Sequence, residues 1–127
     1  MEDVKRGKKI ARTNVIGAQC AGEHFSIECY QQKTDSEFFE TWFVNNLLKE
    51  IPNGYTAIMD NAAFHKKKKL RQLARGKIRL LFLPPYSPDY NLIEKSWATM
   101  KRSLRGNINK YSSINVAIYN YFGFVGN

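Results

Sequence analysis

Residues 80–104, LLFLPPYSPDYNLIEKSWATMKRSL, set three prolines between an apolar run and a helical pattern. Proline fixes φ and has no backbone N–H to donate, so a regular strand or helix is not expected to continue through this segment. The apolar run Lys77–Leu83 is typical of a strand that is buried on both faces. From Leu92 to about Arg105 apolar residues recur at helical spacing. The sequence therefore predicts a strand, a stiff loop and a helix in succession.

Two β-rich runs near the start, Thr13–Cys20 and His24–Tyr30, are predicted to form a hairpin. A turn centred at residues 22–23 would keep Cys20 and Cys29 from facing each other across the two strands. Neither cysteine has the spacing of a metal-binding group. We therefore expect both to be reduced thiols in the core.

The middle of the chain alternates between helical and strand patterns. Thr34 and Glu37 form a capping box that predicts a helix over about Asp35–Glu50. A short strand over residues 55–59 and a basic helix over His65–Arg75 follow, and a final helix is expected near the end. This order, antiparallel first and then joined by crossovers, favours one α/β domain with a mixed sheet flanked by helices.

The charge balance is strongly basic, with 20 Lys and Arg against 11 Asp and Glu and a formal net charge of +9. Such an excess indicates a polyanionic partner. Residues 66–79 hold eight bases and no acid, a pattern suited to neutralising DNA phosphates, although a solvated helix face would look the same. The candidate DNA-contacting residues are Lys66, Lys67, Lys68, Lys69, Arg71, Arg75, Lys101 and Arg102.

Two acids stand where a site could form. Asp60 closes a short apolar strand, where ligand-binding groups of α/β sheets collect, although such a residue also forms turns or helix caps. Glu94 lies near the start of a helix, where it could equally serve as the capping-box partner of Asn91. Together the two carboxylates suit Mg²⁺ or Mn²⁺, which prefer hard oxygen ligands.

The stretches IMDNAAFH at 58–65 and LFLPPYSPDYNLIEKSW at 81–97 closely resemble the catalytic domain of DDE transposases. The resemblance is to the mariner-type superfamily and its bacterial insertion-sequence relatives, and it extends from about Arg12 to Arg105. It implies a ribonuclease H-like fold. It also places the second and third acids of the family motif at Asp60 and Glu94.

What the resemblance implies is metal-dependent DNA strand cleavage and strand transfer, in which water or a DNA 3′-hydroxyl attacks a phosphodiester in line. Asp60 and Glu94 would hold Mg²⁺ or Mn²⁺, and DNA would be the partner, with a homodimer as a further candidate assembly. A bacterial cytoplasmic location, on the nucleoid when DNA is bound, is expected, and no membrane partner. The residues expected to shape the site are Asn61, His65, Pro85, Tyr86, Ser87, Pro88 and Asn91.

The first acid of the family motif has no clear counterpart. Few residues precede Arg12, and Asp3, the one upstream Asp, lies in a stretch without a strand pattern. We therefore expect residues 1–127 to be the C-terminal part of a DDE catalytic domain, truncated at its N-terminus. The central first strand and a helix-turn-helix domain would then be absent.

Three interpretations remain. The chain could be a transposase fragment that needs an upstream segment for activity. It could be a non-enzymatic, degenerate remnant that binds DNA nonspecifically. The third is a metal-dependent nuclease of the same fold that acts outside transposition.

Overall fold

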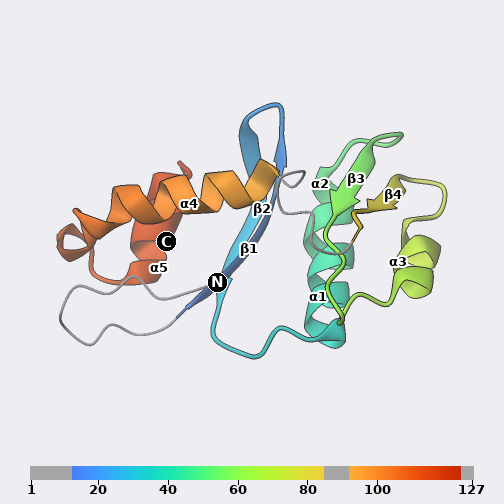
Figure 1. The fold of residues 1–127 in the computed structure, drawn as a ribbon, viewed down its shortest axis with the longest axis horizontal. Coiled ribbons are helices and arrows are strands. Elements are labelled where there is room, and N and C mark those ends of the chain that lie inside the picture. The colour runs from blue at the N-terminus through green and yellow to red at the C-terminus, as the bar shows by residue number, and fades with distance from the viewer. Residues whose placement is uncertain (1–12, 85–91, 124–127) are drawn as a thin grey trace. The chain divides into compact units, whose positions relative to one another are not determined.

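The computed structural model describes residues 13–84 and 92–123, which form two compact units. The first unit combines residues 13–32 with residues 93–123. Its elements are β1 (Asn14–Cys20), β2 (Glu23–Tyr30), α4 (Leu92–Arg105), the 3-10 helix η3 (Ile108–Lys110) and α5 (Ile114–Tyr121). The second unit contains α1 (Ser36–Trp42), the π-helix η1 (Phe43–Leu47), α2 (Leu48–Glu50), β3 (Thr56–Met59), α3 (Lys67–Ala74) and β4 (Arg79–Phe82). Figure 1 shows these elements. None of the described helices is long and apolar enough to cross a membrane.

β1 and β2 form the predicted antiparallel hairpin, but its turn lies one residue earlier than expected. Cys20 pairs with Glu23, so the two turn residues are Ala21 and Gly22. Both have positive φ, at 52° and 84°. A two-residue turn of this kind matches the twist of the strands, and it needs left-handed backbone at both positions. Gly22 therefore occupies the second turn position rather than the first.

The cysteines are free, as predicted, but they differ in burial. Cys29 is half-buried on β2 and pairs with Val15, and burial raises the pKa of its thiol to about 11. Cys20 is exposed, because it ends β1 beside the turn. The expectation of a core thiol is therefore wrong for Cys20.

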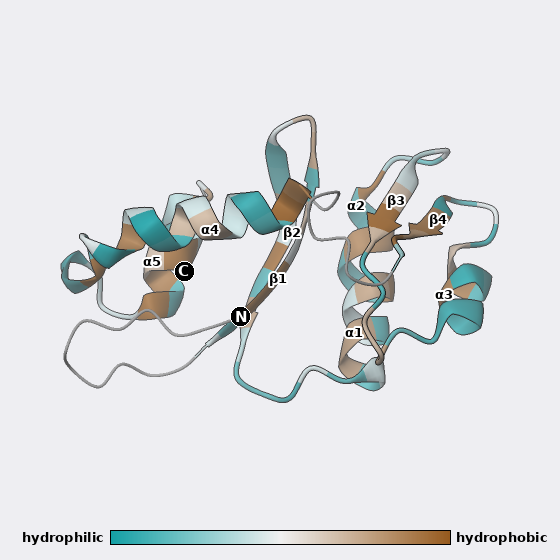
Figure 2. Ribbon diagram, viewed as in Figure 1, coloured by the Kyte–Doolittle hydropathy of each residue, from teal (hydrophilic) through white to brown (hydrophobic). Residues whose placement is uncertain are grey.

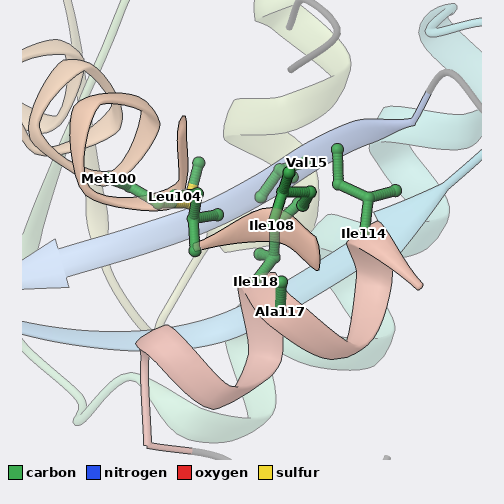
Figure 3. Packing of buried hydrophobic residues seen from close by; sticks show 7 residues of the cluster. All are labelled: Val15, Met100, Leu104, Ile108, Ile114, Ala117 and Ile118. Atoms are coloured by element: carbon green, nitrogen blue, oxygen red, sulfur yellow. The ribbon is translucent and has the colours of Figure 1, made fainter. Parts of the chain in front are cut away.

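The core of the first unit is formed where α4, η3 and α5 pack on the hairpin. Figure 3 shows its seven buried members, Val15, Met100, Leu104, Ile108, Ile114, Ala117 and Ile118. Met100 and Leu104 are four residues apart on α4, which places both on one face of the helix. The backbone N–H of Cys29 also donates to the Tyr119 hydroxyl over 2.8 Å, which ties α5 to β2.

The second unit begins with the predicted helical stretch, which runs from α1 through η1 to α2. Its N-cap is Asp35, whose side chain accepts a hydrogen bond from the Phe38 backbone N–H over 2.9 Å. The capping box built on Thr34 is therefore wrong by one residue. Phe39, Trp42 and Phe43 recur at helical spacing along this stretch and are buried, so they form its core-facing side.

β3 and β4 pair in parallel and are joined by α3, as the alternating pattern predicts. The predicted burial of β4 on both faces is wrong within the described residues. Ile58 and Leu81 are cross-strand partners, and they are 55% and 52% exposed. Figure 2 shows the apolar colouring of these two strands. An apolar strand sequence does not by itself ensure that other elements of the protein cover both faces of the strand.

The antiparallel and the parallel strand pairs form two separate two-stranded sheets in the described part of the chain. Helices accompany both pairs. The mixed α/β class is therefore confirmed, and it is consistent with a ribonuclease H-like domain.

Candidate functional site

Asp60 directly follows β3, at the carboxyl end of the parallel strand pair. The loop after it leads to α3 and is fixed at two points. The His65 backbone N–H donates to the Ala62 carbonyl over 3.0 Å, and Ser36 Oγ at the start of α1 donates to the Phe64 carbonyl over 2.6 Å. These two bonds hold the loop in a shape that places His65, shortly before α3 begins, next to Asp60.

The result is a direct contact between two predicted site residues. His65 Nε2 lies 2.9 Å from Asp60 Oδ1. The His65 side chain is only 3% exposed, whereas the Asp60 side chain is 55% exposed. A buried imidazole therefore holds one oxygen of a carboxylate that remains open to solvent.

Aromatic rings surround the His65 imidazole. Its ring centroid lies 4.4 Å from that of Phe39, 4.6 Å from that of Phe64 and 6.1 Å from that of Phe82. Its Nδ1 is buried and has no hydrogen-bond partner in the described part of the chain. A hydrogen placed on Nδ1 would lack an acceptor, at a cost of about 1–3 kcal/mol. In the neutral ring the hydrogen therefore belongs on Nε2, which donates to Asp60.

This environment shapes the electrostatics of Asp60. The hydrogen bond from His65 is the largest influence and lowers the pKa of the Asp60 carboxyl. Partial burial acts in the opposite direction, while the electrostatic interaction with His65 and the backbone N–H of Ala62 lower the pKa further. Asp60 is therefore ionised at neutral pH, as a metal-binding carboxylate has to be.

Three basic side chains of α3 contact other side chains of the second unit. Lys67 Nζ lies 5.3 Å and Arg71 Cζ 4.9 Å from the centroid of the Phe82 ring, which suits cation–π contacts. On the other side of the helix, Lys69 Nζ lies 2.9 Å from Glu40 Oε1. Three bases of the cluster thus have partners within the protein, which the sequence pattern did not indicate.

Glu94 belongs to the first unit and lies exposed in the first turn of α4. Two contacts fix this end of α4 on β1. Ser96 Oγ donates to Gln19 Oε1 over 2.6 Å, and the Trp97 ring lies 3.3 Å from the point where a Cβ on Gly17 would stand. The absence of a side chain at Gly17 therefore allows the helix that carries Glu94 to approach the strand.

A family model described as DDE superfamily endonuclease matches residues 1–115. The chain belongs to this family. No curated protein and no solved structure matches it significantly. DDE superfamily endonucleases are transposase-like nucleases that act on DNA and generally use divalent metals. The resemblance to DDE transposases is thereby confirmed at the level of the family.

Several residues assigned from the DDE resemblance lie outside the described residues, namely Pro85, Tyr86, Ser87, Pro88 and Asn91. Asn61 is half-buried beside Asp60. On α4, Lys101 is half-buried, and the exposed Arg102 donates from Nη2 to Thr99 Oγ1 over 3.4 Å.

The metal expected for a DDE endonuclease can be tested against the side chains present. Within residues 13–84 and 92–123, no group of three or more His, Cys, Asp or Glu side chains is arranged to hold an ion. Asp60 nevertheless has the properties of one hard oxygen ligand: it is ionised, oriented by His65 and open to solvent. Among the described residues of the second unit, the Asp60 carboxylate is therefore chemically suited to act as one ligand of a divalent ion, but no complete set of ligands is assembled there.

Proposed function

We propose that this chain carries metal-binding and DNA-contacting residues of a transposase catalytic domain, which cleaves DNA strands and transfers them to new sites. The observation that carries the proposal is the buried His65 that holds the solvent-open carboxylate of Asp60 at the end of β3. Asp60 and Glu94 are the proposed ligands of Mg²⁺ or Mn²⁺. Membership of the DDE endonuclease family supports this assignment.

The proposed roles of the side chains follow from their chemistry. His65 fixes the direction of one Asp60 oxygen through Nε2 and keeps the carboxyl ionised, because the hydrogen bond stabilises the charged form. Glu94 supplies a second carboxylate from α4. Bound divalent ions would supply Lewis-acid activation of the reacting oxygens. Exposed bases neutralise the DNA phosphates and position the strand.

Asp60 and Glu94 do not complete such a site by themselves. Two-metal centres hold their ions about 3.5–4 Å apart, an arrangement that we expect to need at least one further carboxylate. We propose that an upstream segment supplies it and is required for strand cleavage. A non-enzymatic role in DNA binding is the alternative, and the basic surface of α3 would serve either function.

Calorimetric titration of the protein with Mn²⁺ tests the assignment of the ligands. We expect measurable binding that is weakened by Asp60→Asn and, separately, by Glu94→Gln. The matched control is Asp35→Asn, which alters a carboxylate that caps α1 and is not a proposed ligand. Equal Mn²⁺ affinity in all four proteins would contradict the proposal. If DNA binding persisted in that case, the non-enzymatic alternative would be favoured.

A further inference from the structure

The helix α3 presents two kinds of basic residue. Leu70 and Ala74 are 0% and 1% exposed, so they define the inner face of the helix. With 3.6 residues per turn, Lys68 and Gln72 fall on the opposite side, together with Arg75, the C-cap of the helix. All three are exposed. We call this line of residues the outer ridge.

The bases that flank the outer ridge are engaged within the second unit. Lys67 and Arg71 lie over the Phe82 ring on one side, and Lys69 pairs with Glu40 on the other. If these side chains bound a phosphate of another molecule, they would lose their contacts with Phe82 and Glu40. Lys68 and Arg75 show no ion pair and no ring contact within the described part of the chain, so binding a phosphate costs them no such contact.

We propose that the outer ridge of Lys68, Gln72 and Arg75 is the surface of α3 that binds the nucleic-acid backbone, whereas Lys67, Lys69 and Arg71 fasten the helix to the protein. This inference rests on the proposed function, and it divides a basic cluster that the sequence presents as uniform. The surface that binds phosphates is therefore narrower than the basic cluster of residues 66–79.

The composition of the outer ridge fits phosphates better than a protein partner. Lysine and arginine release counterions from a polyanion, and the Gln72 amide can donate a hydrogen bond to a phosphate oxygen. Protein interfaces are usually centred on buried aromatic or apolar anchors, and the outer ridge has none. Lys68 and Arg75 are seven positions apart, which at helical rise separates them by about 10 Å, comparable to three nucleotide steps of about 3.4 Å along one strand.

The test compares two double variants of the full chain that remove the same charge from the same helix. Lys68→Gln/Arg75→Gln changes the outer ridge, and Lys67→Gln/Lys69→Gln changes the fastening residues. Binding to a duplex of arbitrary sequence is measured over a series of KCl concentrations, with thermal melting of each variant alongside. Log affinity falls as log salt rises, and each lost phosphate contact makes this slope less steep by about 0.9.

We expect the slope to become less steep by about 1.8 for the outer-ridge variant. For the fastening variant we expect little change in the slope but a lower melting temperature. Equal slopes in the two variants would overturn the division of the cluster. If the fastening double variant unfolds, Lys68→Gln against Lys69→Gln makes the same comparison with adjacent residues. Absence of duplex binding by the unchanged protein would overturn both this inference and the DNA-binding part of the proposed function. Binding of polyglutamate as tight as that of the duplex would contradict a nucleic-acid ligand for the outer ridge.

Discussion

His65 Nε2 lies 2.9 Å from Asp60 Oδ1, while the other nitrogen of the same ring is buried without a partner in the described part of the chain. In the neutral imidazole, Nε2 therefore carries the hydrogen and donates it to Asp60. With its second nitrogen buried and unpartnered among the described residues, the ring is suited to hold Asp60 in position rather than to pass on a proton. The contact accounts for the lowered pKa of the Asp60 carboxyl.

The lowered pKa of Asp60 predicts a specific dependence of stability on pH. Because the carboxyl has a lower pKa in the folded protein, it contributes stability above its unfolded pKa of about 3.9. That contribution disappears as the pH falls through the lowered folded value. Urea unfolding of the protein and of Asp60→Asn should therefore give a difference in unfolding free energy that shrinks as the pH falls from about 5. A difference that stays constant over this range would contradict the prediction.

Substitutions of His65 separate positioning from packing. His65→Phe keeps an aromatic ring among Phe39, Phe64 and Phe82 but removes the donor to Asp60. We expect Mn²⁺ affinity to fall by about tenfold or more, as is typical when the group that orients a ligand is lost. His65→Gln retains a donor and should recover part of the affinity. Calorimetry supplies the measurement, and equal affinities in the two variants would show that the ring acts through packing alone.

Gly17 should be sensitive to the smallest substitution. A Cβ at this position would collide with the Ile27 side chain and approach the Trp97 ring to 3.3 Å. Gly17→Ala is expected to lower the free energy of unfolding by about 1–3 kcal/mol, the range for overpacking. Urea unfolding followed by tryptophan fluorescence measures the effect. Gly106→Ala is the matched control, because a Cβ there meets nothing within 4 Å.

We expect no detectable strand cleavage by residues 1–127, because the two proposed ligands, Asp60 and Glu94, are fewer carboxylates than we expect a two-metal site to need. Incubation with supercoiled plasmid and either Mg²⁺ or Mn²⁺ provides the measurement. Nicking that is lost in both Asp60→Asn and Glu94→Gln would show that the set of ligands is already complete.

The position of Asp60 at the end of a strand could be predicted from the sequence, because a short apolar strand followed by an acid is a local pattern. The surroundings of His65 could not be predicted in the same way, since its ring packs against Phe39 from α1 and Phe82 from β4, which are distant in sequence. The same limit applies to α3, where the partner of Lys69 is Glu40, 29 positions earlier. Local patterns also misplaced the hairpin turn by one residue, because the left-handed backbone at Ala21 is not signalled by alanine.

Paramagnetic broadening by Mn²⁺ can show whether Asp60 is a metal ligand that His65 holds in position. The two-dimensional NMR spectrum of the full chain is recorded as Mn²⁺ is added in small steps. We expect the backbone signals of Asn61 and Ala62 and the ring signals of His65 to broaden first, and we expect Asp60→Asn to abolish this selectivity. Broadening that is uniform along the chain, or that is unchanged in Asp60→Asn, would contradict it.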